Sequence, residues 1–265
     1  MTTTADWNPD QYRRFADERS QPFYDLLDLI QREGLETGVD LGCGPGELTA
    51  LAARQLGLRQ MVGIDNSPTM LAATREFQTP SVQFRNGDLA TWSETTPVDL
   101  VIAAASLQWV PDHAEVITRW RGSLRPGGQI AVQVPANSHA ATHVIASQLA
   151  REEPFLSAFG PSGPPIDPVH ENVVRPDDYA RILRNAGFSE QKVFLRVYPH
   201  VLADADAVIS WVRGTTLTRF ARSLPPSVFE VFVENYSERI RAHYGEDQPV
   251  FFPFSRILFW GQLPR

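Results

Sequence analysis

The sequence is poor in cysteine and in long apolar runs. Its 265 residues include one cysteine, Cys43, so no disulfide can form within the chain and no cysteine-rich metal site exists. The longest apolar candidate, residues 100–110, is too short to span a membrane and contains Gln108. The first residues carry no apolar signal core. We therefore expect a cytoplasmic protein without a membrane partner or a metal.

Lysine is also scarce, since Lys192 is the only one, and the 31 acidic residues outnumber the 24 lysines and arginines, which gives a formal net charge of −7. Such a balance argues against nucleic acid or an anionic membrane surface as the main partner. Hydrophobic residues make up 43% of the chain, which is enough for a well-buried core and argues against disorder. We expect a folded monomer that binds a small molecule and no nucleic acid.

Short apolar runs alternate with helical segments in the first half of the chain. The apolar runs predict strands at 38–42, 60–65, 82–88, 98–105 and 128–135. The helical spacing predicts helices within 46–57, 67–77 and 113–128, the last stopped by Pro126 and Gly127, with Ser67 as N-cap and Pro68 at the first helical position of the second. This alternation predicts an α/β fold with a doubly wound, mostly parallel sheet.

The alternation stops after Pro135, where a proline- and glycine-rich loop and additional helices follow. We interpret the second half as one continuing core that carries two helical cap insertions. The expected segments are an N-terminal lid helix (1–30), a cofactor-binding core (31–135), cap insertion 1 (136–175), a core helix and strand (176–202), cap insertion 2 (203–252) and a final core strand (253–265).

The stretch "VDLGCGPGELT" places a glycine-rich turn between a strand and a helix. Its pattern is D-x-G-x-G-x-G, formed by Asp40, Gly42, Gly44 and Gly46, whereas the dinucleotide fingerprint is G-x-G-x-x-G. An acid beside this turn opposes a diphosphate and suits a ligand that carries an ammonium group. The loop therefore favours S-adenosylmethionine and disfavours an NAD-dependent oxidoreductase.

Two more acids lie at or near predicted strand ends. Asp65 comes 19 residues after Gly46, where a carboxylate can bind the two hydroxyls of a ribose, and Asp88 can accept the exocyclic amine of adenine. Each acid could instead cap a helix or form a turn. Because the carboxyl ends of parallel strands line one crevice, we expect all three acids at one ligand.

Several motifs together resemble a known family. The motifs "VDLGCGPGELT", "GIDNSP", "GD" and "LRPGG" are similar to those of the class I S-adenosylmethionine-dependent methyltransferases. Within that class, "WNPDQY", "ERSQP" and "ASLQWVPDH" resemble the trans-aconitate 2-methyltransferases. The resemblance implies a seven-stranded sheet whose last strand is antiparallel. It also implies methyl transfer to a carboxylate of trans-aconitate, which gives a monomethyl ester.

The predicted cofactor positions gather on the glycine loop, the strand ends and the N-terminal helix. They are Arg19, Asp40, Gly42, Cys43, Gly44, Gly46, Asp65, Asn66, Asp88, Leu89 and Ala104. Trp7 precedes that helix, and Tyr12, Phe15 and Arg19 share one face of it, so the helix either closes over the ligand or packs on the core.

The predicted substrate positions combine aromatic, amide and basic side chains. They are Tyr12, Gln108, Trp109, His143, Trp211, Arg213 and Arg256. Residues 207–229 hold Arg213, Arg219 and Arg222 but no acid. Arginine offers paired donors that match the carboxylates of a tricarboxylate substrate. A solvated basic helix face explains any single arginine equally well, and Trp109 on its own fits an ordinary core position.

A carboxylate acceptor is already an anion at neutral pH, because its reference pKa is about 4. We therefore assign no general base and no catalytic residue, and expect catalysis by positioning. A methyltransferase acting on a hydroxyl or amine would need a base, for which His143 or His113 are candidates. A third hypothesis is a module that binds S-adenosylmethionine without catalysis.

Overall fold

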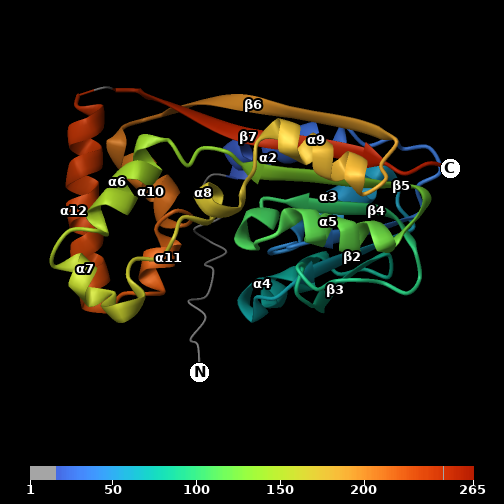
Figure 1. Cartoon of the computed structure of the whole chain (residues 1–265), viewed down its shortest axis with the longest axis horizontal. Coiled ribbons are helices and arrows are strands. Elements are labelled where there is room, and N and C mark those ends of the chain that lie inside the picture. Colours follow the sequence, from blue (N-terminus) through green and yellow to red (C-terminus); the bar gives the residue numbers. More distant parts are fainter. Residues whose placement is uncertain (1–15, 247) are drawn as a thin grey trace. The chain divides into compact units, whose positions relative to one another are not determined.

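The computed structural model describes residues 16–246 and 248–265, with side chains from Ser20 onward (Figure 1). The contacts within this part of the chain divide it into two units. The helical unit comprises residues 137–171 and 197–255. The sheet unit comprises the described residues up to Ala136, together with 172–196 and 256–265.

Strands and helices alternate through the first half of the chain, as the sequence predicts. The strands are β1 (Thr37–Leu41), β2 (Gln60–Asp65), β3 (Val82–Asn86), β4 (Val98–Ala104), β5 (Leu124–Pro135), β6 (Glu190–Leu202) and β7 (Val250–Gln262). The α-helices are α2 (Ala16–Leu27), α3 (Glu47–Leu56), α4 (Pro68–Ala73), α5 (His113–Gly122), α6 (Ala141–Leu149), α7 (Phe155–Ala158), α8 (Pro168–Asn172), α9 (Pro176–Asn185), α10 (Ala205–Arg213), α11 (Thr218–Ala221) and α12 (Pro226–Tyr244). The 3-10 helices are η1 (Thr74–Phe77), η2 (Leu107–Trp109) and η3 (Gly160–Ser162).

The strands form one sheet in the order β3-β2-β1-β4-β5-β7-β6. The neighbours from β3 through β5 pair in parallel, and β7 runs antiparallel to β5. The predicted doubly wound, seven-stranded sheet with an antiparallel last strand is therefore confirmed. The strand order reverses between β1 and β4, and the carboxyl ends beside this switch point are where α/β sheets bind ligands.

Helices cover both faces of the sheet, because its central strands are apolar on both sides. In β4, Val101 and Ala103 belong to one core cluster with Trp120 of α5 and Leu183 of α9. Ile102, whose side chain lies on the opposite face of the sheet, is also fully buried. Helices α2 and α3 contact each other and also contact β5 and β2, respectively. Because both faces of the sheet are covered, polar side chains can contact a ligand only at the ends of the strands.

Two predictions about helix ends have opposite outcomes. Ser67 caps α4 as predicted, since its hydroxyl accepts a hydrogen bond from the Met70 N–H at 3.3 Å. The third helix starts at His113 as predicted, but its predicted end at Pro126 and Gly127 is wrong, because α5 ends at Gly122 and β5 begins two residues later. Pro126 and Gly127 belong to β5, where the register with β4 shifts and Gly127 adopts φ 75°. They form an irregularity in a strand instead of stopping a helix.

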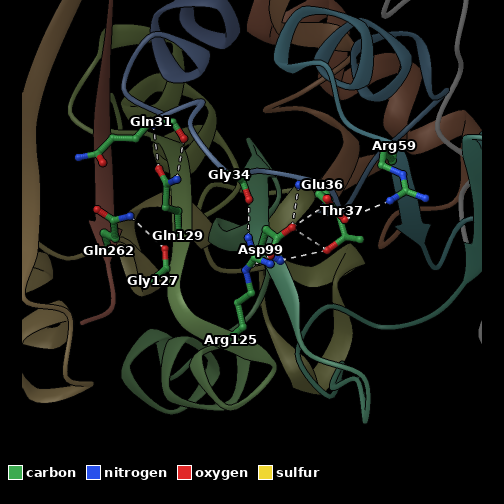
Figure 2. A network of polar contacts seen from close by, with 10 residues as sticks. All are labelled: Gln31, Gly34, Glu36, Thr37, Arg59, Asp99, Arg125, Gly127, Gln129 and Gln262. Atoms are coloured by element: carbon green, nitrogen blue, oxygen red, sulfur yellow. Dashed lines mark hydrogen bonds and ion pairs between the residues drawn. The ribbon is translucent and has the colours of Figure 1, made fainter. Parts of the chain in front are cut away.

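A polar network ties together the amino ends of β1, β4 and β5 (Figure 2). The buried carboxylate of Asp99 accepts hydrogen bonds from the N–H groups of Glu36 and Thr37, both at 2.8 Å. Arg125 forms an ion pair with Asp99 and donates to the Gly34 carbonyl. This network closes the end of the sheet that lies opposite the carboxyl ends.

The helical unit has an aromatic core of its own. The ring of Phe232 in α12 packs edge-to-face against Phe155 of α7 and at a tilt against Phe220 of α11, with ring centroids 5.1 and 4.7 Å apart. The Tyr236 hydroxyl donates to the Thr142 carbonyl and joins α12 to α6. Among the described residues, no helix combines the length and apolarity needed to cross a membrane.

Candidate active site

The glycine loop connects β1 to α3 at the switch point of the sheet. Gly42, Gly44 and Gly46 have φ of 78°, 56° and 88°, which glycine adopts without steric cost. A Cβ on Gly42 would lie 2.2 Å from the Cβ of Ser106, whereas a Cβ on Gly44 would meet no atom within 4 Å. Gly42 is therefore required by packing, and Gly44 borders open space that a ligand can fill.

The amides of this loop are already engaged inside the protein. Every residue from 42 to 46 except Pro45 donates its N–H to a protein acceptor. The acceptors are the carbonyls of Ile64 and Cys43 and the carboxylate of Asp65. Residues 42–46 therefore leave no amide for a diphosphate, and Glu47 adds negative charge where the first-turn amides of α3 would otherwise attract one. The geometry therefore agrees with the predicted preference for a ligand without phosphate.

Asp40 is a buried acid with half of its hydrogen-bonding capacity unused. Its Oδ2 accepts a hydrogen bond from the Thr49 hydroxyl at 2.6 Å, while Oδ1 has no partner among the residues that the structure describes. Burial raises the pKa of Asp40 to about 7, although the bond from Thr49 opposes the rise. The neighbouring Cys43 thiol is also buried, and burial together with the nearby Asp40 raises its pKa well above the usual range. A cationic ligand group beside Oδ1 would satisfy Asp40.

Asp65 ends β2 and is held by two backbone donors. Its Oδ1 accepts from the Ser67 N–H at 2.8 Å and its Oδ2 from the Gly44 N–H at 2.9 Å. Burial raises the pKa of this carboxyl, and these hydrogen bonds partly offset the rise. Each carboxylate oxygen can accept a further hydrogen bond, as the hydroxyls of a ribose would require. Asn66, the next predicted residue, is exposed.

Asp88 does not end the third strand, so that prediction is wrong. β3 ends at Asn86, and Asp88 lies exposed in the turn that follows, where its Oδ1 accepts from the Ala90 N–H at 2.9 Å. This is the local role that aspartate commonly has in turns. Leu89 is half-buried, and its carbonyl accepts the indole N–H of Trp120. Contact of Asp88 or Leu89 with adenine stays a prediction.

The turn after β4 lies directly against the glycine loop. The half-buried Ala104 ends the strand, and Ala105 adopts φ 55°, a left-handed conformation that is uncommon for alanine. The Ser106 hydroxyl donates to the Leu41 carbonyl at 2.5 Å. Gln108 is buried; its Nε2 donates to the Ala105 carbonyl at 2.7 Å, and its Oε1 has no partner in the described part of the chain.

Two side chains from other elements fix this turn. His113 donates from Nε2 to the Leu107 carbonyl at 2.9 Å, and its Nδ1 lies 2.7 Å from the Tyr179 hydroxyl. Burial lowers the pKa of His113, which favours the neutral ring. Asn172 donates to the Gln108 carbonyl at 2.9 Å. Both ring nitrogens of His113 therefore support the structure of the turn.

Comparison with known proteins decides the family. Residues 39–128 match a family model described as a methyltransferase domain. The chain is 38% identical over 240 residues to trans-aconitate 2-methyltransferase of Methylobacterium radiotolerans, covering 91% of each chain. It is 37% identical over 259 residues to the Deinococcus radiodurans enzyme of the same name, covering 97% of this chain and 98% of that one. The chain belongs to the trans-aconitate 2-methyltransferase family.

Solved structures of distant proteins share the fold. The YcgJ protein of Bacillus subtilis superposes with a TM-score of 0.59 at 14% identity, covering 92% of this chain and 99% of its own. A Haemonchus contortus phosphoethanolamine N-methyltransferase 2, solved with S-adenosylhomocysteine, has a TM-score of 0.55 at 16% identity and covers 92% of this chain and 53% of its own. These likenesses support the fold of this family member.

The remaining predicted site residues of this methyltransferase fall into three groups: those in the sheet unit, those near the N-terminus of the chain and those in the helical unit. Arg256 starts the part of β7 that pairs with β5, where it stands opposite Pro135, and it donates to Gln133 Oε1 at 2.7 Å. Trp109 is 37% exposed, so its interpretation as a core residue is wrong. Arg19 lies in α2, but its side chain, like Trp7, Tyr12 and Phe15, falls outside the described structure.

Other predicted substrate residues lie in the helical unit of the methyltransferase. Trp211 is buried against His200 and Phe252, as an ordinary core residue would be. Arg213 forms an exposed ion pair with Glu230 at 3.2 Å. Glu230 is the first acid after the acid-free stretch 207–229. These surroundings offer no support for Trp211 or Arg213 as substrate residues, and their contact with substrate stays a prediction.

A buried cluster around His143 was not predicted from the sequence. His143 Nδ1 and the Arg219 guanidinium both bind Asp167 Oδ2, at 2.6 and 2.9 Å, and His143 Nε2 lies 3.2 Å from the Thr216 hydroxyl. Burial opposes ionisation of Asp167, but the bonds and charges of His143 and Arg219 hold its pKa well below the ordinary value. The acid-free stretch was the available signal for Arg219, while its partner Asp167 lies in a distant loop.

Proposed function

We propose that this chain uses S-adenosylmethionine to methylate a carboxylate of trans-aconitate, giving a monomethyl ester and S-adenosylhomocysteine. The observation that carries the choice of donor is the glycine loop, whose amides are engaged while Asp40 Oδ1 stays unpartnered. Such a loop suits a nucleoside with an ammonium group and no phosphate. The name shared by the curated relatives supports trans-aconitate as the acceptor.

The residues of the sheet unit fit this donor group by group. Asp40 Oδ1 would accept the ammonium, the space beside Gly44 would hold the amino-acid end, and Asp65 would bind the ribose hydroxyls. When bound, S-adenosylmethionine supplies a methyl group activated by the positive charge on its sulfur. The chain's task is to hold that methyl in line with the attacking oxygen and away from water.

The acceptor needs orientation and no proton transfer. A carboxylate oxygen takes the methyl as the carbon–sulfur bond breaks, and the sulfur leaves as a neutral thioether, so charge balances without a base. Arg256 lies at the carboxyl end of β5, the same sheet edge as the glycine loop. We assign Arg256 to a carboxylate that does not react, since arginine matches carboxylate geometry with paired donors.

A hydroxyl or amine acceptor is the alternative, and it needs a base near the methyl group. The two histidines considered for this role are both engaged. His113 uses both ring nitrogens to hold the turn after β4. His143 lies between Asp167 and Thr216. These contacts favour the carboxylate acceptor.

Mass spectrometry of the products tests the proposal directly. The protein is incubated with S-adenosylmethionine and, separately, trans-aconitate, cis-aconitate, citrate and a phenol. We expect a monomethyl ester of trans-aconitate together with S-adenosylhomocysteine. Methylation of the phenol alone would reject the carboxylate acceptor, and the absence of S-adenosylmethionine binding would reject the donor.

We further propose that the protein acts as a monomer in the cytoplasm and binds no nucleic acid. The formal net charge of −7 disfavours a nucleic-acid partner. Light scattering on a size-exclusion column measures the mass in solution, with a single-chain mass expected. A mass of two or more chains would contradict the monomer.

A further inference from the structure

Apart from Asp99 Oδ1, which is paired with Arg125, two buried acceptors in the sheet unit have no donor among the described residues, and the fold brings their segments together. They are Asp40 Oδ1 at the end of β1 and Gln108 Oε1 after β4. We propose that Gln108 is a positioning residue for the methyl donor, whose positively charged part donates a hydrogen bond to Oε1. This inference rests on the proposed use of S-adenosylmethionine, and it moves Gln108 from the substrate to the cofactor.

The orientation of the Gln108 amide follows from its neighbour. Nε2 lies 2.7 Å from the Ala105 carbonyl oxygen, which can only accept a hydrogen bond. If the amide were reversed, two oxygens would face each other at this distance. The Ala105 carbonyl is itself held in place, because the Ala105 N–H donates to the Gln133 carbonyl at 2.9 Å. Oε1 must therefore point away from Ala105.

The unpartnered oxygen sits on a rigid turn. Gln108 is 4% exposed, so Oε1 is shielded from the solvent that would otherwise hydrate it. The Gln108 backbone is tied to Asn172, and the preceding residue Leu107 is tied to His113. A buried acceptor without a donor raises the free energy of the ligand-free protein. A ligand that brings a donor recovers that free energy on binding.

The chemistry of the two ligands selects the donor. Fully ionised trans-aconitate carries acceptor oxygens only, so it would be repelled by Oε1. S-adenosylmethionine offers an ammonium group and a sulfonium methyl whose hydrogens carry partial positive charge. Ser106 packs against Gly42, which places the turn of Gln108 beside the loop that follows Asp40. Both acceptors therefore suit a cationic ligand, and S-adenosylmethionine carries two positively charged groups.

Calorimetric titration separates the two possible donor groups. The full chain, as wild type and as Gln108→Met, is titrated with S-adenosylmethionine and with S-adenosylhomocysteine, which keeps the ammonium but lacks the methyl and the sulfur charge. We expect Gln108→Met to bind S-adenosylmethionine about ten-fold more weakly or worse. An equal loss for both ligands identifies the ammonium, and a loss for S-adenosylmethionine alone identifies the sulfonium methyl.

Two further variants separate the acceptor oxygen from the shape of the turn. Gln108→Glu keeps Oε1 but sets a second oxygen against the Ala105 carbonyl, so it should bind S-adenosylmethionine more tightly than Gln108→Met without necessarily reaching wild type. Asn172→Ala removes a backbone anchor of the same turn but leaves Oε1, so its loss should be smaller than that of Gln108→Met. Thermal melting checks that each variant is folded.

Three results would overturn the inference. Unchanged binding of both ligands to Gln108→Met with a raised KM for trans-aconitate would return Gln108 to the substrate. Equal losses in Gln108→Met and Asn172→Ala would mean that only the shape of the turn matters. Binding of S-adenosylmethionine by Gln108→Glu that is no tighter than that by Gln108→Met would exclude the acceptor oxygen. If the wild type itself fails to bind S-adenosylmethionine, the proposed function is what fails.

Discussion

Asp40 is placed where ligand binding and stability make opposite demands. Its pKa rises from 3.8 to about 7 because the carboxyl is buried, so the charged form is disfavoured in the ligand-free protein. Because the pKa of Asp40 is higher in the folded than in the unfolded protein, its protonated form stabilises the fold. This stabilisation is complete below about pH 4 and is lost as the pH rises through about 7. The same carboxylate, once charged, is what a bound ammonium requires.

Replacing Asp40 by asparagine should therefore stabilise the ligand-free protein while weakening donor binding. In thermal melts at about pH 8, Asp40→Asn should unfold at a higher temperature than wild type, with the difference vanishing near pH 4. S-adenosylmethionine affinity of the wild type should rise between about pH 6 and pH 8, and that of the variant should be lower and flat. A variant that is less stable than wild type at pH 8 would contradict this view of Asp40.

Arg256 is the residue on which substrate affinity should depend. Arg256→Gln should raise the KM for trans-aconitate about ten-fold or more, since a charge-assisted hydrogen bond contributes about 1.5–3 kcal/mol. The affinity for S-adenosylmethionine should be unchanged, which titration measures. Arg181→Gln is the control in the same unit, because that arginine forms exposed ion pairs with Asp177 and Asp178. An unchanged KM in Arg256→Gln would remove Arg256 from the substrate site.

At the scale of elements, the sequence predicts strands well and their ends less well. β2 and β4 were predicted almost to the residue, because buried parallel strands form short, continuous apolar runs. The end of α5 was missed because Pro126 and Gly127 look like a helix stop, yet they lie at a register shift within β5. A bulge depends on the partner strand, which lies elsewhere in the sequence.

In the candidate site, too, some features could be predicted from the local sequence and others could not. The positions of Asp40, Asp65 and the glycines at or near the ends of β1 and β2 could be predicted, because the turn after a strand has a local sequence pattern. The contact between Ser106 and Gly42 could not, because 64 positions separate them and only the pairing of β1 with β4 brings them together. Asp88 was misplaced by two residues, since aspartate is common both at strand ends and in turns.

The network at the amino ends of the strands should support stability without touching donor binding. Asp99→Ala leaves the N–H groups of Glu36 and Thr37 without their acceptor (Figure 2). Asp99 is buried and both hydrogen bonds are partly buried, and a hydrogen bond to a charged group contributes about 1.5–3 kcal/mol, so we expect a loss of about 3 kcal/mol or more in urea unfolding. Arg59→Gln, which removes an exposed ion pair with Glu36, is the control. Weaker S-adenosylmethionine binding in folded Asp99→Ala would show that the two ends of the sheet are coupled.

At the scale of the whole molecule, the chain builds its helical unit from two separated segments, 137–171 and 197–255. The cluster of His143, Asp167 and Arg219 joins them, since the first two lie in one segment and Arg219 in the other. No local pattern announces such a contact, because Asp167 and Arg219 are 52 positions apart. An acid-free run in the sequence indicates an arginine that needs a partner but does not identify the partner.

This cluster should control the acid stability of the helical unit. Asp167→Asn leaves Arg219 buried without its counter-charge, so we expect a loss of about 3–5 kcal/mol at neutral pH. Because the pKa of Asp167 is held low, its contribution is present above about pH 4 and is lost as the pH falls further. The difference between variant and wild type in urea unfolding, followed by tryptophan fluorescence, should therefore shrink below pH 4. Glu152→Gln removes an exposed pair with Arg239 and should leave the unfolding midpoint unchanged. A loss in Asp167→Asn that stays constant down to about pH 2 would mean that shape, and not charge, is what the cluster contributes.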